Sequence, residues 1–196
     1  HRLSQQLLPI PIDQRYSTPC AGTIYSPRKF IGIPDGGIAY CSNPYPVEEQ
    51  DYSHNRCSHL LRRIDQSPQE GYADFRQNSS KLEGQPIRTM SSLTERLIHG
   101  TDFEYVRQRR MQNYQHLHKT LAQTNHLALP SLDTFSCPMA YPYLTDAPTL
   151  RQRLIENQVF VPTYWPNVPQ WSPSDSLEHR LSQQLLPIPI DQRYST

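Results

Sequence analysis

The chain lacks a long apolar run and lacks an excess of charge of either sign. No apolar stretch approaches the roughly 20 residues that a membrane-spanning helix needs, and none resembles a signal peptide. The formal net charge is only +1, with 19 Lys and Arg against 18 Asp and Glu. A balanced charge produces no field that attracts nucleic acid or an anionic membrane surface, so we expect neither as a partner.

Metal-binding patterns are also missing. The four cysteines show no CxxC pair and no zinc-finger spacing: Cys20, Cys41, Cys57 and Cys137. Of the eight scattered histidines, His116 and His118 are two residues apart, so on a helix they point in different directions. We therefore expect no metal site. Unpaired, reduced thiols are typical of a cytoplasmic protein.

Proline and tyrosine are what the chain has in abundance. Its 196 residues leave room for one domain or for parts of two. Nineteen prolines are about twice the usual share of about 5%. Aliphatic residues are modest in number, so the twelve tyrosines, five phenylalanines and two tryptophans have to supply much of the core.

The clearest predicted element is a long helix. Phe103, Val106, Arg110, Tyr114 and Leu117 are separated by three or four residues and form one stripe. Arg107, Arg109 and Arg110 cluster there, and acidic neighbours favour a solvated helix face over a phosphate grip. Shorter helices are predicted over 57–64 (with Leu60, Leu61 and Ile64 inward), 68–77, 90–98 (capped by Ser91 or Ser92 and ended by Gly100) and 147–157.

Short strands and one polar loop complete the pattern. Strands are predicted over 23–25, 37–41, 138–143 and 158–161, and a final helix leads into an extended segment. Residues 42–60 are polar and rich in turn formers, which predicts a surface loop. A strand, a helix, a strand, a terminal helix and an extended segment describe a small α/β layer.

The two ends of the chain carry the same sequence. Residues 1–18 recur without change as residues 179–196. Structural repeats that evolved together diverge, so a recent duplication or an artefact of how the reading frame was assembled explains the identity better than a solenoid does. Because Ser176, Leu177 and Glu178 lead naturally into the second copy, we treat 1–18 as a duplicated copy of the C-terminal tail.

One lysine stands in a segment built to present it. Lys29 lies between two β-prone runs and is followed by Pro34 and by Gly36 and Gly37, residues that define the path of a turn. A lysine amine is mostly protonated near neutral pH, and imine chemistry needs it desolvated or beside another cation. The alternative is a surface hairpin with a solvated lysine.

This segment resembles the cofactor-lysine segment of the DegT/DnrJ-type sugar aminotransferases, which are pyridoxal phosphate enzymes of the aspartate aminotransferase fold. Their pattern is Lys-x-Leu-x-x-Gly-Glu-Gly-Gly. Here Lys29 takes the place of the Schiff-base lysine, Ile31 that of the leucine, Pro34 that of the first glycine and Asp35 that of the glutamate. The two glycines that end the motif match outright.

The resemblance implies a fold class, α/β, with a partial aspartate aminotransferase-type fold. Residues 19–100 would be the remainder of the cofactor-binding large domain, and 101–196 the connecting helix with the small C-terminal domain. It implies pyridoxal 5'-phosphate as cofactor, a homodimer, and amino transfer from an amino donor to a nucleotide-linked keto sugar. Lys29 would be catalytic, Ser26 and Arg88 would contact the cofactor, and Tyr164 and Trp165 would lie near the substrate.

Two departures from the family pattern qualify this activity. Pro86 stands where the family has an asparagine that reaches the cofactor phosphate, and proline has neither a side-chain amide nor an N–H. Asp13 is the only aspartate ahead of Lys29, and it belongs to the duplicated tail, so no residue is expected to tune the pyridine nitrogen. We therefore expect this chain alone to be inactive. The alternative to an aminotransferase fragment is an inactive remnant or a dimerisation module.

Overall fold

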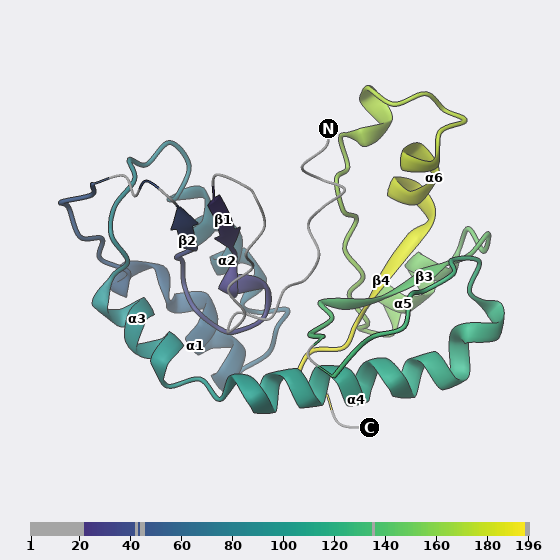
Figure 1. Cartoon of the computed structure of the whole chain (residues 1–196), viewed down its shortest axis with the longest axis horizontal. Helices are drawn as coiled ribbons and strands as arrows, with labels where there is room; N and C mark the ends of the chain where they lie inside the picture. The colour runs from purple at the N-terminus through teal and green to yellow at the C-terminus, as the bar shows by residue number, and fades with distance from the viewer. Residues whose placement is uncertain (1–21, 42, 44–45, 135, 195–196) are drawn as a thin grey trace. The chain divides into compact units, whose positions relative to one another are not determined.

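The computed structural model describes residues 22–41, 43, 46–134 and 136–194 (Figure 1). Within these residues the fold is mixed α/β, with six α-helices and two two-stranded antiparallel sheets. The chain divides between Asp102 and Phe103 into two compact units. The duplicated copy at 1–18 lies outside the described residues. The α/β class is confirmed, whereas the aminotransferase-type arrangement stays a prediction.

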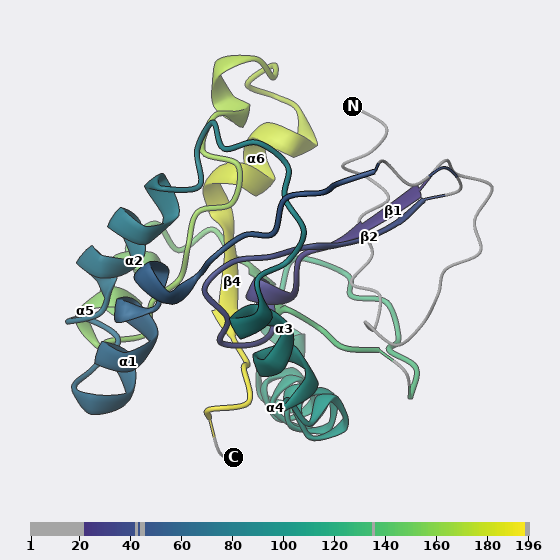
Figure 2. The ribbon, with the colours of Figure 1, turned by 90° about the vertical axis from the view of Figure 1, so that its left-hand side faces the viewer.

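The unit that ends at Asp102 begins with the hairpin that carries Lys29. Strands β1 (Gly22–Tyr25) and β2 (Ile38–Cys41) are antiparallel and lie side by side in Figure 2. Tyr25 pairs with Ile38, and the short 3-10 helix η2 (Pro27–Lys29) follows β1 directly. Both predicted strands are confirmed, since β-branched and aromatic residues favour the extended backbone.

Short helices form the rest of this unit: η3 (His54–Arg56), α1 (Ser58–Asp65), α2 (Tyr72–Ser80) and α3 (Ser92–His99). The predicted caps of α3 are confirmed, because the Ser91 hydroxyl accepts the Thr94 N–H at 3.1 Å and Gly100 follows the last turn, although the helix starts two residues later than predicted. Helix α2 begins four residues later than predicted, because residues 68–71 form a turn ahead of it.

The predicted inward face of α1 is wrong at two of its three residues, whereas Leu60 is half-buried. Leu61 and Ile64 are exposed, with 61% and 80% of their surface accessible, while His59 is buried. The reason lies in α2, where the Asn78 side chain meets His59 Nδ1 at 3.1 Å and the Phe75 ring lies edge-on to the imidazole. Burial lowers the pKa of His59, helped by the Arg63 and Arg28 charges. Packing against α2, with its contact to Asn78, therefore buries His59 and leaves Leu61 exposed.

The segment 42–60 also differs from the prediction of a surface loop. Ser53 and Arg56 are buried. They bond to Asp35, which lies 18 and 21 residues earlier, so no local pattern predicts their burial.

The second unit begins with the long helix α4 (Phe103–Leu121), which is the predicted helix. Its stripe is confirmed, since Val106, Arg110 and Tyr114 are buried. The elements that follow are η4 (Ala122–Thr124), β3 (Ala140–Leu144), α5 (Leu150–Glu156), η5 (Val168–Gln170), α6 (Leu177–Gln184) and β4 (Leu185–Pro189). In the described part of the chain, no helix is both long and apolar enough to span a bilayer.

A tyrosine-rich core holds this unit together. Tyr141 is completely buried and its ring centroid lies 5.1 Å from that of Tyr114 on α4. The remaining members of the buried cluster are Tyr143, Val161, Leu186 and Ile190. Aromatic rings bury large areas and favour tilted or edge-on contacts at this spacing, so they compensate for the modest aliphatic content.

Prolines lie inside the β3–β4 ribbon without disrupting it. Pro142 pairs with Pro187. Two residues further along β3, and so on the same face of the strand, Leu144 pairs with Leu185. The Leu144 N–H and C=O bond away from β4, to the Asn125 side chain and the His126 N–H. At these alternate positions the backbone N–H and C=O groups point away from the partner strand. A proline at such a position therefore removes no hydrogen bond between β3 and β4.

Residues 158–161 do not form the predicted strand. One side of β3 pairs with β4 and the other is occupied by residues 125 and 126, so neither edge of β3 is available to them. Val161 is nevertheless buried in the core. The prediction of a strand is therefore wrong, although Val161 of this run joins the core, while Phe160 beside it stays exposed.

Candidate functional site

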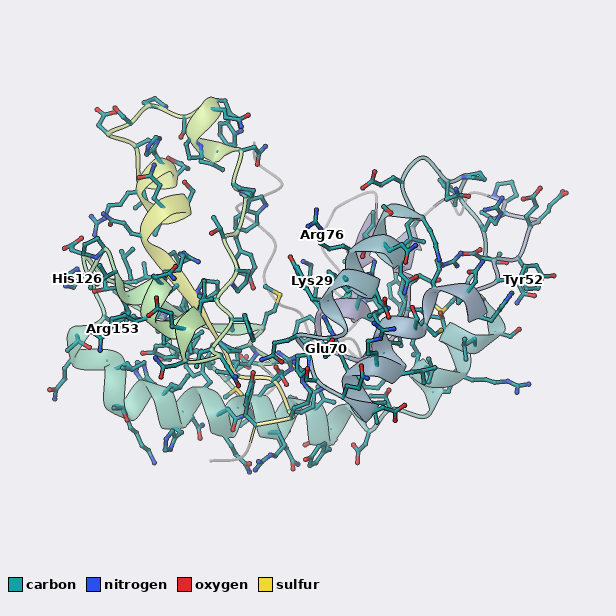
Figure 3. All side chains as sticks on the ribbon, turned by 180° about the vertical axis from the view of Figure 1, so that it is seen from behind. Lys29, Tyr52, Glu70, Arg76, His126 and Arg153 are labelled. Atoms are coloured by element: carbon teal, nitrogen blue, oxygen red, sulfur yellow. The ribbon has the colours of Figure 1, made fainter. Side chains whose placement is uncertain are left out.

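The Lys29 amine is presented by a tightly bonded turn. The Lys29 N–H donates to the Ser26 carbonyl at 3.2 Å, and Phe30 and Ile31 both donate to the Pro27 carbonyl at 2.8 and 3.0 Å. Proline at the first position of η2 pre-sets the backbone for this turn. The Lys29 side chain is exposed (Figure 3). Local sequence thus places the backbone of Lys29, while its amine faces solvent.

Asp35, the acid of the motif, is the anchor of the loop that follows. Its carboxylate is buried and accepts the Thr94 hydroxyl at 2.6 Å and the Ser53 hydroxyl at 2.7 Å. The Arg56 guanidinium donates to the same carboxylate through Nε at 2.8 Å and a terminal nitrogen at 2.5 Å. The same terminal nitrogen of Arg56 also donates to the Asp51 carboxylate at 2.6 Å.

The charge balance of this cluster keeps Asp35 ionised. Burial acts to raise the pKa of Asp35, but the hydrogen bonds from Thr94, Ser53 and Arg56, together with the Arg56 charge, outweigh it. The pKa of Asp35 therefore lies below its ordinary value. Charge-assisted hydrogen bonds of this kind are about twice as strong as neutral ones, so the cluster fixes the loop firmly.

Gly36 completes the anchored turn. Its φ is +93°, in the region that favours glycine. An added Cβ would lie 3.0 Å from Thr94 Cγ2 and 3.2 Å from Met90 Cε. The glycine that matches the family motif is therefore required here by backbone conformation and by close packing.

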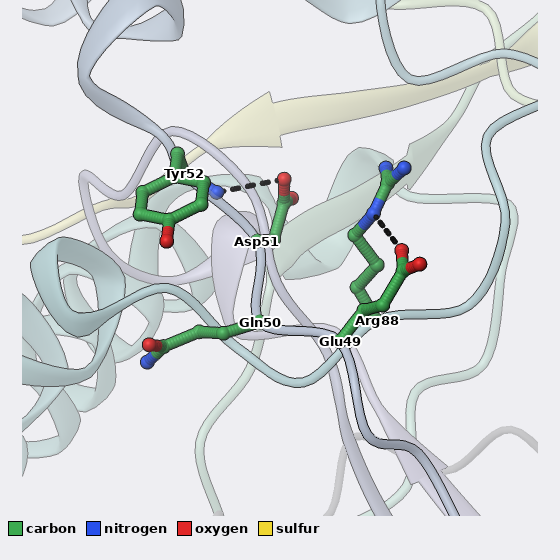
Figure 4. Close-up of a pocket in the computed structure, with 5 residues that line it drawn as sticks. All are labelled: Glu49, Gln50, Asp51, Tyr52 and Arg88. Carbon is green, nitrogen blue, oxygen red and sulfur yellow. Dashed lines mark hydrogen bonds and ion pairs between the residues drawn. The ribbon is translucent and has the colours of Figure 1, made fainter.

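Arg88, the expected phosphate contact, lies elsewhere in this unit. Its Nε pairs with the Glu49 carboxylate at 3.2 Å and one terminal nitrogen donates to the Gln85 side chain at 3.2 Å. It lines an open depression of about 520 Å³ with Glu49, Gln50, Asp51 and Tyr52 (Figure 4). Lys29 is not among the residues that line this depression.

The other predicted site residues are divided between the two units. Ser26 is exposed, and its side chain makes no capping hydrogen bond to η2. Tyr164 and Trp165 belong to the second unit, where their rings lie edge-on at 5.8 Å. Trp165 is 60% exposed, with a φ of 51° that is uncommon for a bulky residue. Their contact with a sugar stays a prediction.

The arginines of α4 have a structural role that the sequence did not suggest. Arg110 is buried and donates to the Pro138 and Met139 carbonyls at 3.3 and 3.1 Å. Arg109 donates to the Tyr194 carbonyl at 2.9 Å. The prediction of a solvated arginine face is therefore wrong for Arg110, because the backbone carbonyls of Pro138 and Met139, just ahead of β3, compensate for its burial.

The groups around the Lys29 motif do not make up a pyridoxal phosphate site. The cofactor needs, in one place, a lysine, a partner for its ring nitrogen and donors for its phosphate. Asp35 is fully engaged by Ser53, Thr94 and Arg56, and Arg88 is bonded to Glu49. These groups do not fit the cofactor, and we derive no reaction step through it. Among the described residues no three His, Cys, Asp or Glu gather as a metal site.

Ser53, Arg56 and Thr94 are the site residues that sequence reasoning missed. They are separated from Asp35 by 18, 21 and 59 positions, and none belongs to a motif. A single signal could have pointed to them: an acid inside a proline- and glycine-rich turn needs a partner if the turn is buried.

Comparisons of the chain with protein-family models, with curated proteins and with solved structures found no match. The resemblance to the aminotransferases therefore depends on the sequence motif at Lys29–Gly37.

Proposed function

We propose that this chain carries the cofactor-lysine hairpin of a DegT/DnrJ-type, pyridoxal phosphate-dependent sugar aminotransferase, and that by itself it is catalytically silent. The observation that supports the first half is the antiparallel β1–β2 hairpin with Lys29 on the turn after β1. The exposure of Lys29 and the engagement of Asp35 support the second half. A keto sugar as substrate, an amino donor and a homodimer follow from the family resemblance.

The hairpin would act by presenting one amine next to one fixed cation. Arg28 precedes Lys29, and its guanidinium is held by the Ser79 hydroxyl at 3.2 Å and lies over the Phe75 ring at 5.9 Å. A positioned cation attracts an anionic phosphate. We therefore expect an aldehyde that bears a phosphate to react faster with Lys29 than with a lysine that has no such cation beside it.

The test is reductive trapping of pyridoxal phosphate on the three lysines of the chain. After borohydride reduction, peptide mass spectrometry should find Lys29 labelled several-fold faster than Lys119, and Arg28→Gln should remove the difference. Lys81 is a poor reference, because its amine bonds to the Asn55 carbonyl and the Asn78 side chain at 3.0 and 3.2 Å.

The two halves of the proposal fail separately. Equal labelling of Lys29 and Lys119 in the unmodified chain would remove the special status of the hairpin amine. A saturable aldimine absorbance that Lys29→Ala abolishes would instead show a complete cofactor site and overturn the catalytically silent half. The expected result is selective labelling without saturation.

A further inference from the structure

The C-terminal segment 185–194 fills a defined seat in the second unit. We define the tail slot as the edge of β3 together with the side chains of Arg109, Arg110 and Asn113 on α4 and of Arg151 on α5. Strand β4 pairs with β3 from Leu185 to Pro189, and the residues after it run along α4 (Figure 1). Leu186 and Ile190 of this segment are buried in the core.

The tail slot recognises mainly the backbone of its occupant. The Asn113 amide donates to the Ile190 and Asp191 carbonyls at 3.2 and 3.0 Å. Arg151 donates to the Leu185 carbonyl at 2.8 Å, and Arg109 to the Tyr194 carbonyl at 2.9 Å. All of these donors lie outside the segment they hold. Any extended segment with the same apolar positions and prolines satisfies the same donors.

The chain contains a second segment of that description. Residues 7–16 repeat residues 185–194 without change, so Leu8 and Ile12 correspond to the buried Leu186 and Ile190. One chain therefore carries two copies of this segment, whereas its described residues form one slot of this kind. We propose that residues 1–18 are an alternative occupant of the tail slot, in exchange with residues 179–196.

The exchange has a physical consequence for assembly. An N-terminal segment that enters the slot of its own chain leaves a monomer with a displaced C-terminal tail. One that enters the slot of a second copy links two chains head to tail, which produces rings or open chains. The same contacts hold either occupant, so their populations differ only through tethering and through chain concentration.

A register-specific disulfide tests the proposal. Ala140 pairs with Pro189, whose counterpart in the first copy is Pro11. We expect Ala140→Cys with Pro189→Cys to cross-link under mild oxidation, and Ala140→Cys with Pro11→Cys to cross-link at a rate within about tenfold of it, since directly opposed strand residues suit a disulfide. The control is Ala140→Cys with Ile10→Cys, because the adjacent residue points to the other face of the ribbon.

Electrophoresis without reductant separates the two sources of the occupant. A cross-linked species of monomer size identifies the chain's own N-terminal segment, and one of dimer size identifies that of a second copy; either supports the proposal. Failure of the Pro11→Cys pair where the Pro189→Cys pair reacts overturns it, as does equal reaction of the Ile10→Cys control.

A second measurement does not depend on engineered cysteines. Ile190→Asp places a charge at a position that is 1% exposed. If the first copy substitutes for the second, Ile190→Asp alone and Ile12→Asp alone each keep the amides of β3 protected in hydrogen exchange. The double variant loses that protection. If Ile190→Asp alone abolishes protection as completely as the double variant, residues 1–18 do not occupy the slot.

Discussion

Replacing Asp35 with asparagine removes the charge that anchors the loop after Lys29. The change keeps the shape of the side chain but leaves Arg56 buried with Asp51 as its remaining carboxylate partner. Breaking a buried ion pair by removing one partner costs about 3–5 kcal/mol, and the surviving Asp51 contact reduces this to about 2–4 kcal/mol. For a unit of this size we expect the melting temperature to fall by about 10–25 °C.

The assay should resolve the two units of the chain. Hydrogen exchange with mass spectrometry, read along a urea series, reports residues 22–102 and 103–194 through separate peptides, and only the first set should lose protection early. The matched control is Glu49→Gln, another carboxylate-to-amide change. Glu49 pairs with Arg88 at an exposed site, so its loss costs at most about 1 kcal/mol.

The same variant carries a pH signature. Because the pKa of Asp35 is lowered in the folded state, its contribution to stability is complete above the ordinary carboxyl pKa of about 3.9 and is lost as the pH falls through the lower folded-state value. The stability difference between the unmodified chain and Asp35→Asn should therefore shrink below about pH 4. If Asp35→Asn destabilises no more than Glu49→Gln at neutral pH, the cluster does not hold this loop.

Three further substitutions test other parts of the fold. Gly36→Ala should destabilise its unit by about 1–3 kcal/mol in urea denaturation, because φ is +93°, whereas Gly37→Ala should cost less; equal effects would contradict the strain argument. Tyr141→Ala should cost about 3–5 kcal/mol, and Tyr105→Ala on the exposed side of α4 about 1 kcal/mol or less, as thermal denaturation would show. Ser91→Ala should cost about 1 kcal/mol and speed hydrogen exchange in the first turn of α3; unchanged exchange would exclude a role as cap.

Features set by neighbouring residues could be predicted from the sequence. The two strands around Lys29, the Ser91 cap and the stripe of α4 depend on residues a few positions apart, and the structure confirms all three. The position of Lys29 on a turn after β1 belongs to the same group.

Features set by distant partners could not be predicted. Asp35 finds Thr94 across 59 positions, and His59 is buried because Asn78 from another helix meets it. The pairing of Arg88 with Glu49 spans 39 positions and engages the guanidinium that the sequence assigned to a phosphate. Each depends on which segment packs alongside, and periodicity within one segment carries no information about its neighbour.

The prolines of the β3–β4 ribbon affect what the unit does when it is stressed. A two-stranded ribbon has two outer borders, and an unpaired N–H on either is a template for a foreign strand. The backbone groups that face these borders belong to every second residue, and three of those residues are prolines: Pro142, Pro187 and Pro189. Because proline has no N–H, the borders carry no donor at these positions. If heat or crowding loosens the surrounding helices, the exposed edges of the ribbon offer few backbone N–H donors. A strand from another molecule then forms few hydrogen bonds to them, which disfavours fibril growth.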